Sequence, residues 1–141
     1  MIQKKLNSRL YCLRKLRSFN VNTAILASFY NSVICSVWGY CLICWGGNVS
    51  KATRQPLDKI IKRAGRIIGQ CQESLDSVYQ QRICSKLVGV MGDCSHPLHD
   101  TFQSKMIPRS GRLRAVNSGT DRYKNSFVPR AIIKYNQNFA R

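Results

Sequence analysis

The sequence predicts a mainly α-helical fold, a bundle of four to five helices followed by an extended basic C-terminal tail. Apolar residues recur at steps of three and four along several stretches, which is the spacing of one helix face. Glycines follow the ends of those stretches. From Asp93 onward the pattern gives way to scattered Pro, Gly, Ser and Asn. The expected division is therefore a helical core over residues 1–92 and an irregular basic tail over 93–141, with a short terminal helix.

The first helix is expected over residues 2–17. Its shared apolar face consists of Ile2, Leu6, Leu10, Leu13 and Leu16. Arg9 and Arg17 fall inside the same arc, so their aliphatic stems are expected to carry the charged groups out to solvent.

The second helix is expected to start at Asn22 or Thr23, either of which can cap free amides, and to reach Trp45 before Gly46-Gly47 ends it. No charged side chain lies between Val21 and Asn48. A membrane-spanning helix needs about 20 predominantly apolar residues, and several Asn, Thr and Ser residues interrupt this run. We therefore expect a buried helix at the centre of the core and no membrane association.

The third helix is expected within residues 50–68. Its apolar stripe consists of Leu57, Ile60, Ile61, Ala64, Ile67 and Ile68. Pro56 lacks an amide hydrogen and clashes with the preceding turn, so the helix is expected to kink there or to start nearer Arg54. Gly69 is expected to end it.

A fourth helix is expected over residues 74–91, before Gly92, and a last short helix over 128–136. Pro129 falls in the first turn of that last helix, where a missing amide hydrogen has no cost. The segment between them, from Asp93 to about Asp121, is expected to be irregular.

The charge balance is strongly basic, with 23 Lys and Arg residues against 6 acids and a formal net charge of +17. Self-repulsion of that size is offset when a polyanion accepts the basic side chains. The expected partner is the backbone of RNA or DNA, in preference to an anionic membrane or to no partner. The seven cysteines have no disulfide-framework spacing, so reduced thiols and a cytoplasmic or nuclear location are expected.

Catalytic residues are not apparent in the sequence. The acids are Asp58, Glu73, Asp76, Asp93, Asp100 and Asp121, and no pair has the spacing of a metal-binding carboxylate motif. There is no phosphate-cradling glycine loop and no nucleophile elbow. We expect no enzyme activity and no cofactor.

A zinc site can be assembled on paper from Cys41, Cys44, Cys94, His96 and His99. The first two cysteines have ligand spacing but fall in the most apolar stretch, where cysteine usually behaves as a small hydrophobic residue. We therefore expect these cysteines in the core and no bound metal.

The basic residues form three groups, on the first helix, on the third helix and in the tail. The candidate nucleic-acid-binding residues are Lys51, Lys59, Lys62, Arg63, Arg66, Lys105, Arg109, Arg112, Arg114, Arg122 and Lys124. Cations along one surface neutralise phosphates without reading sequence. Tyr123 and Phe127 have two alternative roles, stacking on bases or anchoring the tail to the core.

Several motifs together resemble one family. They are Arg9-Leu-Tyr-Cys-Leu-Arg-Lys-Leu-Arg-Ser-Phe19, Cys44-Trp-Gly-Gly-Asn48, Leu57-Asp-Lys-Ile-Ile-Lys-Arg-Ala-Gly-Arg-Ile-Ile-Gly69, Asp93-Cys-Ser-His-Pro-Leu-His99, Ser110-Gly-Arg-Leu-Arg114 and Arg122-Tyr-Lys-Asn-Ser-Phe-Val-Pro-Arg-Ala-Ile132. In this order they resemble the region after the catalytic palm of animal non-LTR (LINE-like) retrotransposon reverse transcriptases. The resemblance implies a thumb-like, non-catalytic fragment that grips template and primer, with the absent palm domain as a further partner.

Two alternatives remain beside that resemblance. The first is a structural remnant that folds poorly, because its core evolved against a palm that is absent. Short stretches also resemble an N-terminal signature of AlkB-type tRNA-modifying enzymes. Such a dioxygenase needs His-x-Asp and a distant His around iron, whereas here Asp100 follows His99 directly and no later histidine exists.

Overall fold

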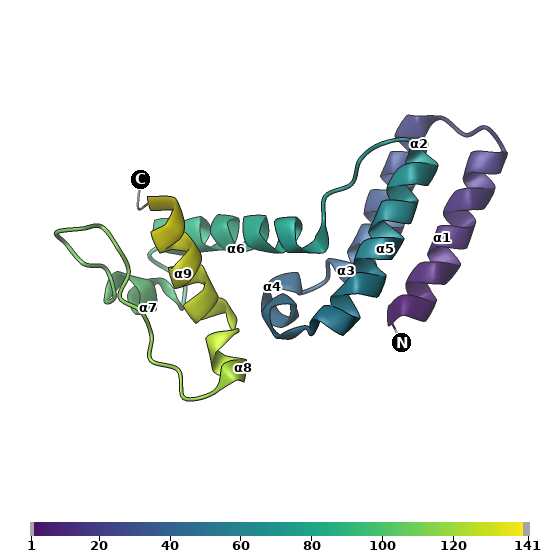
Figure 1. The fold of residues 1–141 in the computed structure, drawn as a ribbon. Helices are drawn as coiled ribbons and strands as arrows, with labels where there is room; N and C mark the ends of the chain where they lie inside the picture. Colours follow the sequence, from purple (N-terminus) through teal and green to yellow (C-terminus); the bar gives the residue numbers. More distant parts are fainter. Residues whose placement is uncertain (1, 140–141) are drawn as a thin grey trace. The chain divides into compact units, whose positions relative to one another are not determined.

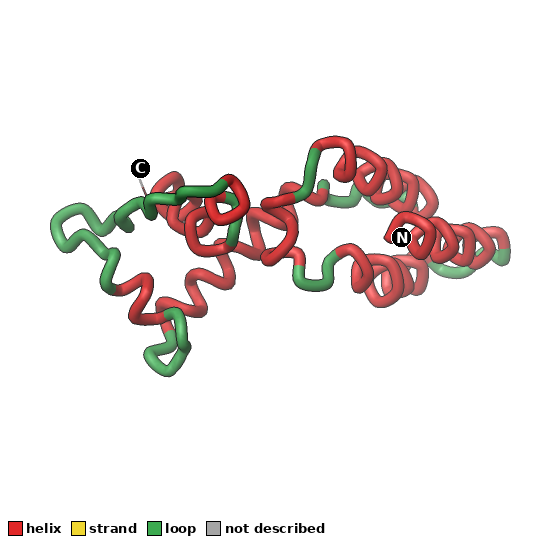
Figure 2. The backbone as a smooth tube through the Cα atoms, turned by 90° about the horizontal axis from the view of Figure 1, so that it is seen from below, coloured by secondary structure: helices red, strands yellow, loops and turns green. Residues whose placement is uncertain are grey.

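The computed structural model describes residues 2–139, and their regular structure is helical, which confirms the expected mainly α fold. Within this part of the chain, β-structure is limited to an isolated antiparallel bridge between Met106 and Leu113. Helices alternate with loops throughout (Figure 2).

The chain divides into two compact units. Unit 1 comprises Met1–Leu42 and Val49–Val78, and unit 2 comprises Ile43–Asn48 and Tyr79–Arg141. The expected division between residues 92 and 93 is therefore not the one in the structure, because the boundary falls inside helix α6 (Leu75–Gly92). The expected irregular tail belongs instead to a unit with its own buried side chains.

Unit 1 is built from three long helical stretches. These are α1 (Ile2–Ser18), the succession α2 (Thr23–Phe29), η1 (Tyr30–Cys35) and α3 (Ser36–Trp38), and α5 (Lys51–Ile68). Helices α1 and α5 lie side by side and run in the same direction (Figure 1). The stretch from α2 to α3, which connects them along the chain, runs in the opposite direction. The predicted apolar faces of α1 and α5 are buried at Leu6, Leu10, Leu13, Leu57, Ile60, Ile61, Ala64 and Ile68.

The expected second helix is correct at its start but wrong as one continuous α-helix. Asn22 caps it, accepting a hydrogen bond from the N–H of Ala24 at 3.0 Å. Its buried residues then recur at a constant step of four, at Leu26, Tyr30, Ile34, Trp38 and Leu42. An α-helical turn has about 3.6 residues, so a strict four-residue stripe drifts around the helix. The wider π-helical turns of η1 rotate the stripe back toward the core.

A break follows α3, where Cys41 adopts a positive φ of 46°. A short helix α4 (Leu42–Trp45) and a 3₁₀ turn η2 (Gly46–Asn48) come next, so the two glycines do end the α-helix. The stretch Thr23–Asn48 is long and apolar enough to cross a membrane by length and composition, a property that core helices of soluble proteins share. Only 33% of its most apolar window is buried, because one face packs and the other is exposed.

Helix α5 begins earlier than expected from Pro56. Ser50 caps it by accepting a hydrogen bond from the N–H of Thr53, and the helix continues from Lys51 through Pro56 without interruption. At the other end Gly69 adopts a left-handed conformation with φ 82° and donates to the carbonyl of Gly65 at 2.8 Å. This is the glycine C-cap expected from the sequence.

Unit 2 contains most of α6 and of α4, together with η2, α7 (His99–Gln103), α8 (Asp121–Lys124) and α9 (Phe127–Phe139). Pro129 lies in the first turn of α9, as predicted. The buried apolar side chains are Tyr79, Ile83, Leu87, Val90, Phe102, Leu113, Ala131 and Ile132. The rings of Phe102 and Phe127 pack edge to face, with centroids 6.2 Å apart. The segment after α6 is thus folded, because its scattered apolar residues reach a common core.

Candidate nucleic-acid interface

Five candidate binding residues project from α5 on the side opposite its buried stripe. We call this set the α5 ridge; it consists of Lys51, Lys59, Lys62, Arg63 and Arg66, and all five are exposed. Steps of three and four bring residues to one side of a helix, so four of them form a row and Arg63 lies beside it. The same periodicity that buries Leu57 and Ile61 therefore presents the cations together.

The acids of unit 1 have partners other than the ridge cations. Asp76 forms an ion pair with Arg54, with 2.8 Å between Nη1 and Oδ1, and this is the salt bridge found among residues 2–139. Asp58 accepts a hydrogen bond at 3.1 Å from the first N–H of α6. Arg54, which the sequence groups with the ridge, is thus neutralised locally. The ridge itself has no ion pair with protein in the described residues, so it can accept an external anion.

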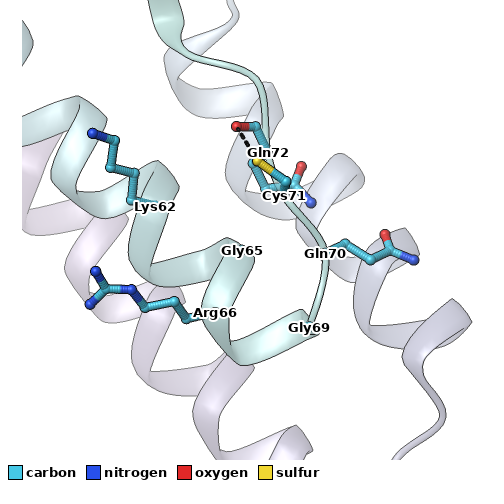
Figure 3. Close-up of a pocket in the computed structure, with 7 residues that line it drawn as sticks. All are labelled: Lys62, Gly65, Arg66, Gly69, Gln70, Cys71 and Gln72. Carbon is cyan, nitrogen blue, oxygen red and sulfur yellow. Dashed lines mark hydrogen bonds between the residues drawn. The ribbon is translucent and has the colours of Figure 1, made fainter.

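A shallow cleft of about 380 Å³ lies beside the C-terminal end of the ridge. Its lining residues are Lys62, Gly65, Arg66, Gly69, Gln70, Cys71 and Gln72. Figure 3 shows Lys62 and Arg66 extending to one side of α5 while Gln70 extends to the other. A Cβ atom at Gly65 would lie 2.7 Å from the carbonyl oxygen of Gln70, so glycine allows the loop to pack closely here. The loop holds this end of α5 and leaves the cations free to point outward.

Helix α1 contributes a second basic surface in unit 1. Its exposed cations are Lys4, Lys5, Arg14, Lys15 and Arg17. Arg9 differs, because its guanidinium donates to the carbonyl oxygen of Val33 in η1. A π-helical turn shifts the register of backbone hydrogen bonds, and a side-chain donor can satisfy a carbonyl left over by that shift. Arg9 therefore serves the fold: it is half-buried, and its charged group bonds the backbone and is not carried out to solvent as expected. Arg17 is exposed.

One aromatic residue was overlooked in the sequence. Tyr11 is 58% exposed on α1, and the Nζ of Lys15 lies 5.9 Å from the centre of its ring. An exposed ring beside cations is a platform on which bases can stack. The signal was a tyrosine four residues before a lysine, a spacing that places both on one helix face.

The remaining candidates lie in unit 2. Arg109, Arg112 and Arg114 are exposed and Lys105 is half-buried, all within the loop of residues 105–114. Arg122 and Lys124 are exposed on α8. The structure thus gathers five candidates on α5, four in one loop and two on α8. Unit 1 carries twelve basic and three acidic residues, and unit 2 carries eleven and three, so both units are strongly cationic.

The two aromatic candidates of the tail take different positions. Phe127 packs on Phe102, so it anchors the segment to the core of unit 2. Tyr123 is 44% exposed on α8, between Arg122 and Lys124. The stacking role thus remains open for Tyr123 alone.

Comparisons with protein-family models, with curated proteins and with solved structures return no match. The resemblance to LINE-like reverse transcriptases therefore stays a prediction, and the functional proposal below depends on the residues and their geometry.

Residues 93–99 form a local turn after α6. Asp93 accepts hydrogen bonds from the Ser95 hydroxyl at 2.6 Å and from the Ser95 N–H at 2.9 Å, and these bonds lower the pKa of Asp93. The Nδ1 atom of His96 accepts from the N–H of Leu98 at 3.1 Å. The Nδ1 atom of His99 lies 3.2 Å from the carbonyl oxygen of Val90. These polar groups fold the chain back onto α6.

The expectation that Cys41 and Cys44 are core residues is wrong. Both are exposed, because the buried stripe passes through Leu42 and neither cysteine falls on it. In residues 2–139, no three His, Cys, Asp or Glu side chains gather as a group that could hold a metal ion.

We predict that the purified chain retains no stoichiometric zinc. Zinc binding needs about four converging ligands, and the thiols of Cys41 and Cys44 have no third partner nearby among the described residues. Elemental analysis after purification in zinc-containing buffer measures this directly. About one zinc per chain, lost on changing Cys41 and Cys44 to serine, would contradict the prediction.

Proposed function

We propose that the chain is a non-catalytic module that binds the backbone of RNA or DNA without strong sequence preference. In its order of motifs it is like the region after the palm of LINE-like reverse transcriptases, and we propose that origin for it. The observation that carries the proposal is the α5 ridge, five exposed cations on one side of a helix whose nearby acids are engaged elsewhere.

The dimensions of the ridge support a nucleic-acid partner. Residues 51–66 span about 22 Å at a rise of about 1.5 Å per residue. A nucleic-acid strand places one phosphate per about 3.4 Å of helix axis, so the ridge matches the length of about six nucleotides. Five cations over that distance suit a continuous polyanion better than a small isolated anion.

The ridge offers little means of reading bases. Lys and Arg side chains in a row contact phosphates, which are the same in every sequence. The helix face between them carries Gln55 and no further polar side chain suited to base edges. Backbone contacts therefore position the ligand, and sequence preference should be weak.

The test is binding of the whole chain to labelled 20-nucleotide RNA and DNA strands of unrelated sequence, followed by fluorescence anisotropy. We expect dissociation constants in the micromolar range that agree within about three-fold among sequences of one type. The five ridge cations alone give a slope of log affinity against log salt of roughly −3.5 on single strands, and contacts elsewhere on the chain steepen it. No saturable binding, or a strong preference for one sequence, would contradict the proposal.

A further inference from the structure

The loop of residues 105–114 is a closed hairpin in place of the irregular segment expected from the sequence. The N–H of Ile107 donates to the carbonyl oxygen of Arg112, and the N–H of Arg114 donates to that of Lys105, each at 2.8 Å. These two bonds flank the bridge between Met106 and Leu113. At the tip, Gly111 has a φ of 62° and donates to the carbonyl oxygen of Ile107 at 2.9 Å.

Asn136 fixes this hairpin to α9. Its Oδ1 accepts from the N–H of Leu113 at 2.9 Å, and its Nδ2 donates to the carbonyl oxygen of Leu113 at 2.8 Å. The backbone groups of Leu113 point away from the opposite strand, because residues 106 and 113 form a pair without mutual hydrogen bonds. The amide of Asn136 thus takes the place of a third strand. With Leu113 only 2% exposed, this attachment sets the orientation of the whole hairpin.

That orientation places the hairpin cations on the outward face. Side chains alternate between the two faces of paired strands, so Leu113 and Met106 face the core of unit 2. Lys105, Arg112 and Arg114 belong to the opposite face, and Arg109 lies at the exposed tip. The loop contains four cations and no acid.

The outward face holds like charges together. Lys105 and Arg114 stand directly opposite each other across the two strands, where Cβ atoms are about 5 Å apart and like charges destabilise the pair. Burial of Leu113 and its hydrogen bonds to Asn136 hold the strands in spite of this repulsion. A bound anion relieves the repulsion, because it is attracted to both cations at once.

We infer that the outward face of the 105–114 hairpin is a second phosphate-binding surface, preorganised by Asn136, for the sugar-phosphate backbone of a nucleic acid. The inference rests on the proposed function and extends it. By this inference, unit 2 contacts the phosphates of the nucleic acid through its own hairpin, in addition to the contacts that the α5 ridge makes in unit 1. Two contacts on one chain raise the affinity for a strand long enough to meet both.

The test compares two single substitutions that each remove one positive charge from unit 2. Arg114→Gln lies on the hairpin, and Lys86→Gln is the matched control on the exposed side of α6. With a 20-nucleotide single strand at 0.1 M salt, Arg114→Gln should weaken binding about five-fold and flatten the salt slope by about 0.7. Lys86→Gln should weaken binding less than two-fold.

A second readout is the melting temperature of the free protein. Arg114→Gln should raise it at low salt, because the repulsion with Lys105 is gone, and the gain should disappear at about 1 M salt, where charges are screened. Equal effects of the two substitutions on affinity and slope would overturn the inference while leaving the proposed function intact. If the unsubstituted chain binds no strand at all, the proposed function itself fails.

Discussion

Replacing Gly47 by alanine is expected to destabilise unit 2 strongly. A Cβ atom at this position would lie 2.0 Å from the carbonyl oxygen of Asn125 and 2.7 Å from the hydroxyl oxygen of Tyr79. The first neighbour is backbone at the end of α8, so it cannot swing aside like a flexible side chain. Forcing atoms into packed space costs about 1–3 kcal/mol and sometimes more, and we expect a loss near the upper end of that range.

The measurement is a thermal melt followed by circular dichroism. A loss of about 3 kcal/mol corresponds to a fall in melting temperature of about 12–24 °C for a unit of this size. The matched control is Gly89→Ala on α6, where an added Cβ has no neighbour within 4 Å. That substitution should stabilise the helix by roughly 0.5–1 kcal/mol. Equal melting temperatures for the two variants would contradict the packing at Gly47.

The same melts decide between a folded module and a poorly folded remnant. The buried side chains of both units predict a cooperative transition for the unsubstituted chain. A broad, featureless transition would support the remnant. It would also remove the basis for treating the α5 ridge as a preorganised surface.

The contact at Gly47 connects two motifs that lie far apart in the sequence. Gly47 belongs to Cys44-Trp-Gly-Gly-Asn48, and Asn125 belongs to the segment Arg122–Ile132. The sequence indicated only that the glycines stop a helix. Close approach of two backbone segments leaves no local periodic signal, so this second role of Gly47 needed the structure.

Local patterns predicted the long helices well. The apolar stripes of α1 and α5, the existence of α6 and α9, the cap at Asn22 and the stop at Gly69 all follow from spacing and from the conformational freedom of glycine. The uncharged stretch before Asn48 was expected to be one buried α-helix, and its four-residue stripe with a π-helical turn was not predicted. The hairpin was missed because it depends on Asn136 reaching Leu113, 23 residues away.

Part of the candidate interface could be predicted from the sequence and part could not. Helical spacing alone groups Lys59, Lys62 and Arg66 on one side of α5. Sequence could not separate these cations from Arg9 and Arg54, whose guanidinium groups are engaged by Val33 and Asp76. A basic side chain can bind a phosphate only if no neighbour in the fold already engages it. The sequence alone does not show these tertiary neighbours.

The α5 ridge is expected to lose most of its contribution to binding when three of its cations are replaced. Changing Lys59, Lys62 and Arg66 to glutamine removes three phosphate contacts and leaves the buried stripe from Leu57 to Ile68 intact. Each contact contributes about 0.7 to the salt slope on a single strand. The variant should therefore bind about 100-fold more weakly at 0.1 M salt, with RNA and DNA affected alike. Its helix content by circular dichroism should match the unsubstituted chain.

A companion variant changes Lys105, Arg109 and Arg112 to glutamine, the same loss of charge in the hairpin of unit 2. Its loss should add to that of the ridge variant, because the two surfaces contact the strand independently.

The salt dependence of binding by the ridge variant tests the central claim most directly. Binding is measured from about 0.05 to 0.5 M salt on one 20-nucleotide strand, with the unsubstituted chain in parallel. A slope flatter by about two units, with helix content unchanged, is the result that we predict. Unchanged affinity and an unchanged slope would contradict it and would mean that the α5 ridge is only a solvated basic face.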